Sequence, residues 1–155
     1  MGADVLMLDE TEKSVLRAFL LRGVRHLVIG GHAVRVHGYR RSTNDLDIVV
    51  DPSPENAARV TQAVSDLGFK GDEAFASGLT QPKKKLTLAR YGCDILTSIE
   101  GRTFEELYRD KVLIAVDGIE VGIISKEHLV EMKDRSDRAK DQRDHRHLTK
   151  ARRAG

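Results

Sequence analysis

Two aspartates, Asp45 and Asp47, stand one residue apart at the start of an apolar run, Ile48-Val49-Val50. Successive side chains of a strand point to opposite faces, and each residue advances the chain by about 3.3 Å. The two carboxylates would then share one face, roughly 6–7 Å apart, while Leu46 and Ile48 point into a core. Bare carboxylates this close repel each other, and a divalent cation removes that repulsion. The spacing therefore predicts a Mg²⁺ site on a strand.

A glycine pair, Gly30-Gly31, lies 14 residues upstream of Asp45 and ends the apolar run Leu27-Val28-Ile29. Residues 32–37 follow with a periodicity that is compatible with a helix. A strand that ends in glycines and opens a helix presents unpaired backbone N–H groups, which bind anions. Glycine also lets a phosphate approach the backbone closely. Alone, such a pair more often marks a plain turn; ahead of the two aspartates, it predicts a phosphate site.

The combined pattern resembles the signature of the polymerase-β-like nucleotidyltransferase superfamily. The stretch VIGGHAVRVHGYRRSTNDLDI, from Val28 to Ile48, looks like the small bacterial branch, which includes toxin–antitoxin and lincosamide-type antibiotic nucleotidyltransferases. The resemblance covers roughly residues 12–147. It implies an α/β (α+β) nucleotidyltransferase fold, a small mixed twisted sheet flanked by helices. Many superfamily members carry serine at the second glycine position, whereas Gly31 offers only its backbone N–H.

The resemblance also implies a third carboxylate on a neighbouring strand. Asp94 matches best, because apolar residues flank it in Gly92-Cys93-Asp94-Ile95-Leu96. Asp72 and Glu73 lie in a polar, glycine-containing stretch and match less well. The expected metal ligands, which are also the expected catalytic residues, are Asp45, Asp47 and Asp94. They would hold Mg²⁺, as one ion or two.

Nucleotide-binding residues are expected around these acids: Gly30, Gly31, His32, Arg41 and Lys133. Arg40 or Arg41 suits the triphosphate because guanidinium pairs well with phosphate oxygens, although a solvated loop explains both equally well. His32 either touches the nucleotide or is a structural histidine at a helix start. In look-alike family members a lysine at the position of Lys133, followed by a Lys-Asp pair, is recurrent. The alternative is that residues 133–146 form a charged, solvent-facing helix.

Composition and local pattern predict one domain over residues 1–150, followed by a basic tail at 151–155. The chain has no run of 18 apolar residues, so we expect no membrane span. We expect no signal peptide either, because Asp4, Asp9 and Glu10 interrupt the N-terminus. A single cysteine, Cys93, fits a reducing cytoplasm. The net charge of +2 is too small to indicate nucleic-acid binding by itself.

Local signals predict an alternation of helices and strands. We expect helices over residues 9–21, after Gly31, from Ser53 to Leu67, from Phe104 to Leu107 and after Ser125. We expect strands that end at Ile29 and that cover 46–50, 86–88, 91–96, 112–116 and 119–124, the last two joined as a hairpin by Asp117-Gly118. Residues 70–82 are rich in glycine, serine and alanine, which predicts a loop.

These expectations describe an enzyme that transfers a nucleoside monophosphate from a nucleoside triphosphate (NTP) to an acceptor hydroxyl. The favoured acceptor is RNA, in particular tRNA, or a protein in a toxin–antitoxin context. RNA is slightly favoured by the basic residues Lys83 to Lys85 and Arg152-Arg153. One alternative is an antibiotic nucleotidyltransferase of the lincosamide or aminoglycoside type. Another is a weakly active, antitoxin-like module that binds a partner toxin. Three converging carboxylates favour catalysis, since a pure binding module does not need them.

Overall fold

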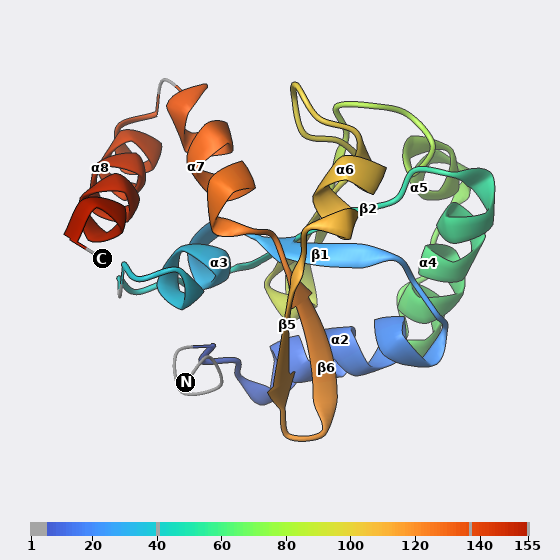
Figure 1. The fold of residues 1–155 in the computed structure, drawn as a ribbon. Helices are drawn as coiled ribbons and strands as arrows, with labels where there is room; N and C mark the ends of the chain where they lie inside the picture. Colours follow the sequence, from blue (N-terminus) through green and yellow to red (C-terminus); the bar gives the residue numbers. More distant parts are fainter. Residues whose placement is uncertain (1–5, 40, 137, 155) are drawn as a thin grey trace.

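The computed structural model describes residues 6–39, 41–136 and 138–154, with side chains through residue 150. A six-stranded mixed sheet with the order β3-β4-β2-β1-β6-β5 forms its centre, and helices flank it (Figure 1). The strands are β1 (His26–Ile29), β2 (Leu46–Val50), β3 (Lys85–Leu88), β4 (Cys93–Leu96), β5 (Val112–Val116) and β6 (Ile119–Ile123). This architecture confirms the expected mixed sheet flanked by helices.

The helices begin where local capping signals predict. Asp9 and Glu12 form a capping box at the start of the first helix, and the Ser53 side chain accepts a hydrogen bond from the N–H of Asn56. Ser125 caps a later helix in the same way. The helices are α2 (Glu10–Leu21), α3 (Gly30–Val36), α4 (Pro54–Asp66), α5 (Glu73–Gly78), α6 (Phe104–Arg109), α7 (Lys126–Asp134) and α8 (Ala139–Ala154), with a short 3₁₀ turn, η1 (Ala89–Tyr91).

Strand pairing brings distant parts of the chain to one edge of the sheet. Strand β2 runs antiparallel to β1 and parallel to β4, so the end of β1 lies beside the starts of β2 and β4. Strand β6 runs parallel to β1, and the β5–β6 hairpin turns at Asp117 and Gly118, which both have positive φ. Positive φ at both central residues is the geometry of a hairpin turn. The core around β1, β2 and β4 is almost wholly aliphatic.

Two segments differ from the sequence prediction. Residues 70–82 are not a simple loop, because Asp72 caps the short helix α5 by accepting a hydrogen bond from the N–H of Phe75. The charged segment from 133 to 146 is not one solvent-facing helix. It divides between α7 and α8, which pack against each other, and α8 continues to Ala154 through most of the expected basic tail (Figure 1). Arg40 and Gly155 lie outside the described residues.

Candidate active site

The sheet register places Asp47 between the end of β1 and Asp94. The Cα atom of Asp47 pairs with Ile29 across the antiparallel β1–β2 ladder and with Asp94 across the parallel β2–β4 ladder. Residues paired in neighbouring strands project from the same face, about 5 Å apart. Asp45 precedes β2 by one residue and is exposed, whereas Asp47 and Asp94 are partly buried. The two aspartates that lie closest in the fold are therefore Asp47 and Asp94, which are distant in sequence.

Both glycines of the pair are required by close approaches. Gly30 has φ +68°, and a methyl group added to it would overlap the Oδ2 atom of Asp47. A methyl group on Gly31 would overlap the Thr43 hydroxyl. A serine at the position of Gly31 would thus displace Thr43, which explains in steric terms why this chain has glycine there. The glycines bring the start of α3 against the carboxylate edge of the sheet.

A cavity of about 140 Å³, here called the central cavity, opens at this edge. It contains seven of the eight predicted site residues, since only His32 is absent from its lining. The central cavity is lined by Gly30, Gly31, Arg41, Asp45, Asp47, Lys85, Asp94, Lys133, Arg138, Lys140 and Asp141. Five basic side chains thus face four carboxylates across one small space. Sequence segments more than 100 residues apart contribute to it.

His32 does not face the central cavity. Its side chain is buried, and its Nε2 atom lies 2.8 Å from Oε2 of Glu12 on α2. Glu12 is itself buried and closes the capping box of α2. The expectation that His32 touches the nucleotide is therefore not supported. Its ring joins α3 to α2, which is the structural alternative that the sequence left open.

The predicted cations Arg41 and Lys133 are held by one buried aspartate, Asp144. Arg41 donates to both Asp144 oxygens, from Nε at 2.7 Å and from Nη2 at 3.0 Å. The Lys133 ammonium lies 3.3 Å from Asp144 and donates to Asp141 at 2.7 Å. Asp144 has no exposed surface, and Lys133 is only 7% exposed. Lys133 is thus a buried cation at the cavity, not part of a solvated helix face.

Asp47 lies beside two further negative charges, which a bound cation would neutralise. Burial raises the pKa of Asp47, and the negative charges of Asp94 and Asp45 raise it further. Asp94 accepts a hydrogen bond from the Thr87 hydroxyl at 2.7 Å, and the Lys85 ammonium lies 3.5 Å from its other oxygen. Within the described ranges, no three His, Cys, Asp or Glu side chains form a group that would hold a metal as they stand. The donor set suits Mg²⁺, which commonly takes one or two carboxylates and completes its shell with water and substrate phosphate.

Two further cavities adjoin the central one. The polar cavity, about 260 Å³, shares Arg41, Asp45, Asp47 and Lys140 with it. The remainder of the polar cavity is lined by Tyr39, Ser42, Thr43, Asn44, Arg143 and Asp144. The bridging cavity, about 250 Å³, shares Gly30, Asp47, Lys85, Lys133, Arg138 and Asp141 with the central cavity and adds Ile29, Leu96 and Met132. The polar and bridging cavities have only Asp47 in common, so this carboxylate is reached from both.

Five residues that line the cavities were not among the predicted ligands: Lys85, Arg138, Lys140, Asp141 and Asp144. Thr87, which donates to Asp94, was not predicted either. The resemblance already pointed to the pair Lys140-Asp141, and two further signals in the sequence point toward others of them. Asp141 and Asp144 are three residues apart, so a helix places them on one face. Lys85 and Thr87 are two residues apart on β3 and so share one face, as Asp94 and Leu96 do on β4. Neither signal shows that α8 packs over the loop before β2. This packing is what buries Asp144.

Comparison with known proteins does not assign the chain to a family. No protein-family model matches it, and no curated protein matches it either. In the part of the chain that the structure describes, no helix combines the length and the apolar character needed to cross a membrane.

Proposed function

We propose that the chain is a Mg²⁺-dependent nucleotidyltransferase with a nucleotidyltransferase fold, acting at the central cavity. One observation carries the proposal: Asp45, Asp47 and Asp94 line the same small cavity as the glycine pair and the basic side chains of Arg41 and Lys133. Carboxylates beside a cluster of cations suit a metal–triphosphate complex, which carries charges of both signs.

The proposed roles follow from the chemistry of each group. Bound Mg²⁺, held by the carboxylates of Asp47, Asp94 and Asp45, would neutralise charge on the attacking and leaving oxygens. Gly30 and Gly31 would offer backbone N–H groups to the β- and γ-phosphates. Lys133 has three N–H donors, and its two aspartates leave one for a phosphate oxygen.

The group transfer is a displacement at the α-phosphorus. The acceptor hydroxyl oxygen forms a new P–O bond as the bond to the leaving pyrophosphate breaks. A carboxylate at the cavity, with Asp94 the first candidate, takes the hydroxyl proton. Arg41 and Lys133 stabilise the charge on the departing pyrophosphate.

The polar cavity suits the acceptor, because it reaches Asp45 and Asp47 and shares no other lining residue than Asp47 with the bridging cavity. Arg41, Lys140 and Arg143 line it together with hydroxyl and amide side chains. Basic and hydrogen-bonding groups favour a polyanionic acceptor, and RNA is our first choice, with a protein hydroxyl second. An antibiotic acceptor or a binding module that grips a toxin is the alternative.

Asp47→Asn tests the proposal at the residue that lies between Gly30 and Asp94. The amide keeps the shape but removes the charge that a cation needs, so we expect transfer to fall by at least about 100-fold. The measurement is incorporation of label from each α-labelled NTP into RNA, protein and small-molecule fractions of a cell extract, with Mg²⁺ and with EDTA. Asp66→Asn, at an exposed aspartate on α4, is the matched control and should keep full activity.

The fraction that takes up label identifies the acceptor class. Label in RNA whose uptake depends on salt supports the favoured acceptor. Undiminished transfer by the Asp47→Asn variant would contradict the assignment of the site. Nucleotide binding without any transfer by the unaltered protein would favour the binding module instead.

A further inference from the structure

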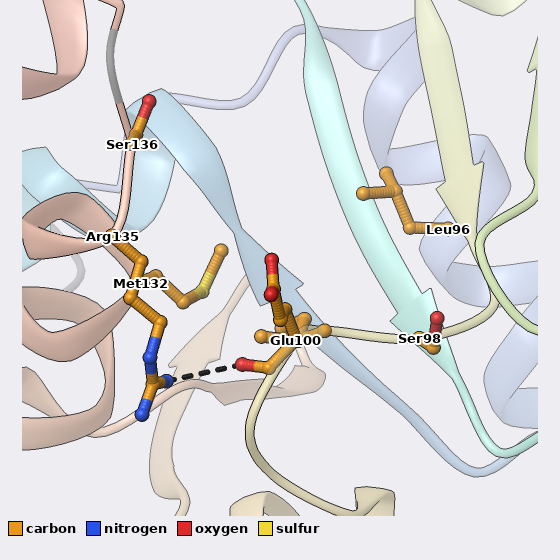
Figure 2. A pocket seen from close by; sticks show the side chains of 7 residues that line it. Leu96, Ser98, Glu100, Met132, Arg135 and Ser136 are labelled. Atoms are coloured by element: carbon orange, nitrogen blue, oxygen red, sulfur yellow. Dashed lines mark hydrogen bonds between the residues drawn. The ribbon is translucent and has the colours of Figure 1, made fainter.

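Beyond the bridging cavity lies a more apolar space of about 280 Å³, here called the Met132 pocket (Figure 2). Leu96, Ser98 and Glu100 reach it from the end of β4 and the segment that follows. Met132 reaches it from α7 and Arg135 from the position directly after that helix, and Nη1 of Arg135 donates to the backbone carbonyl of Glu100 at 3.0 Å. Figure 2 shows Met132 and Glu100 between Arg135 and Leu96. The pocket therefore has apolar walls and a carboxylate at its edge.

The Met132 pocket is continuous with the candidate active site. Leu96 and Met132 line both this pocket and the bridging cavity, which contains Gly30, Asp47 and Lys85. Leu96 is two residues beyond Asp94 on β4 and shares its face, about 6–7 Å along the strand. Met132 directly precedes Lys133 in α7. On β4 the lining thus changes from the charged Asp94 to the apolar Leu96, and on α7 the apolar Met132 stands beside the charged Lys133.

This change from a charged to an apolar lining matches a nucleoside triphosphate, whose charged phosphates and apolar base lie at opposite ends. We propose that the Met132 pocket holds the nucleobase, and that Glu100 selects bases with an exocyclic amino group; the inference rests on the proposed function. Leu96 and the Met132 thioether would contact the faces of the ring. The acceptor would then reach the α-phosphate from the polar cavity.

Glu100 gives the pocket a preference among bases. An ionised carboxylate only accepts hydrogen bonds, so it pairs with the amino groups of adenine, cytosine or guanine. Uracil has no amino group, and the two carbonyl oxygens beside its N3–H repel a carboxylate. Arg135 is held by Glu131 at 3.1 Å as well as by the Glu100 carbonyl, which keeps the segment after β4 in place. UTP should therefore bind the most weakly of the four NTPs.

The test compares ligands with and without a base. Binding of each NTP and of inorganic tripolyphosphate, all with Mg²⁺, is measured for the unaltered protein, Met132→Trp and Glu100→Gln. Leu113→Trp is the matched control, because it adds the same ring at an exposed position on β5. The indole of Met132→Trp fills the pocket, so we expect NTP binding to weaken by about tenfold or more while tripolyphosphate binding is unchanged.

Glu100→Gln keeps the volume of an exposed side chain and so leaves the fold intact. An amide both donates and accepts, so the discrimination against UTP, expected to be about tenfold, should largely disappear. Unchanged NTP binding in Met132→Trp, or equal weakening for NTP and tripolyphosphate, overturns the inference. Retained NTP binding with lost transfer also overturns it and assigns the pocket to the acceptor.

Failure of this inference is distinguishable from failure of the proposed function. If tripolyphosphate binds and the four NTPs bind no more tightly, the phosphate site stands and the base pocket is wrong. If neither ligand binds to the unaltered protein, the proposed function fails and the base pocket fails with it.

Discussion

Asp144 connects the two cations of the candidate site although no ligand role is assigned to it. Arg41 and Lys133 come from the loop before β2 and from α7, and both meet the same fully buried carboxylate. A buried charge is tolerated when its partners surround it, and removing one partner leaves the others uncompensated. Asp144 therefore fixes the position of both cations, and its main effect should be visible in stability.

Asp144→Asn should lower the free energy of unfolding by about 3 kcal/mol, because Arg41 and Lys133 keep their charges in a buried place. Chemical denaturation by circular dichroism measures the change. Asp66→Asn is a close control: Arg22 also donates to both oxygens of Asp66, at 2.7 and 2.8 Å, but that pair is exposed. We expect only a small change for the exposed pair. Equal effects of the two substitutions would show that Asp144 is not buried as described.

At the scale of elements, the junction of β1 and α3 determines where the carboxylate edge lies. Gly30 has the left-handed conformation and lies directly against the Asp47 side chain, so the strand end and the helix start approach β2 closely. Residues other than glycine rarely adopt this backbone conformation.

Gly30→Ala should combine a backbone cost of about 1–2 kcal/mol with displacement of Asp47, and so should abolish transfer. Gly23→Ala separates the two effects. Gly23 has φ +66°, close to that of Gly30, but nothing lies within 4 Å of an added methyl group. The control should show the same loss of stability, measured by thermal unfolding, and should keep its activity. Loss of activity in both variants would assign the effect to stability alone.

Local signals in the sequence account for most of the elements. Capping residues, apolar runs and the Asp117-Gly118 turn are contained in a few neighbouring positions, and the helices and strands begin close to them. Helix α5 was missed because it has only six residues and includes small ones. Such a short helix depends on Asp72 as its cap more than on any periodic pattern.

The site was predicted from sequence motifs. The errors in that prediction arise where tertiary packing decides the position of a side chain. The positions of Asp47 and Gly30 follow from the spacing and the resemblance. The burial of Lys133 and Asp144 depends on α8 packing over the loop before β2, which periodicity in a charged segment does not reveal. His32 follows the glycines directly, yet its direction is determined by Glu12 on another helix.

At the scale of the whole molecule, His37 connects the end of α3 to the end of β6 and makes stability depend on pH. Its Nε2 atom lies 2.7 Å from the carbonyl oxygen of Ile124. Burial lowers the pKa of His37 below its usual value, and Lys126 adds to this, although the Ile124 carbonyl and Glu127 oppose it. The native state therefore resists protonation of a ring that the unfolded state protonates near pH 6.5.

Because the unfolded state binds more protons, the free energy of unfolding should decrease as the pH falls from 7.5 to 5.5. His26, whose pKa burial also lowers, acts in the same direction. Denaturant titrations at the two pH values measure the difference, and His37→Gln should reduce it without removing it, because His26 remains. An undiminished difference in the variant would show that His37 does not contribute.

Helix α8 comes after the other described elements in the sequence, yet its Asp144 anchors cations that face the carboxylates of β2 and β4. A ribosome makes the chain from its N-terminus, so α8 emerges after the segments that carry Gly30, Asp47 and Asp94. The carboxylate edge is therefore synthesised long before the helix that encloses it. During translation Asp45, Asp47 and Asp94 are made before Lys133, Arg138 and Lys140, and the site is complete only when α8 reaches the loop before β2.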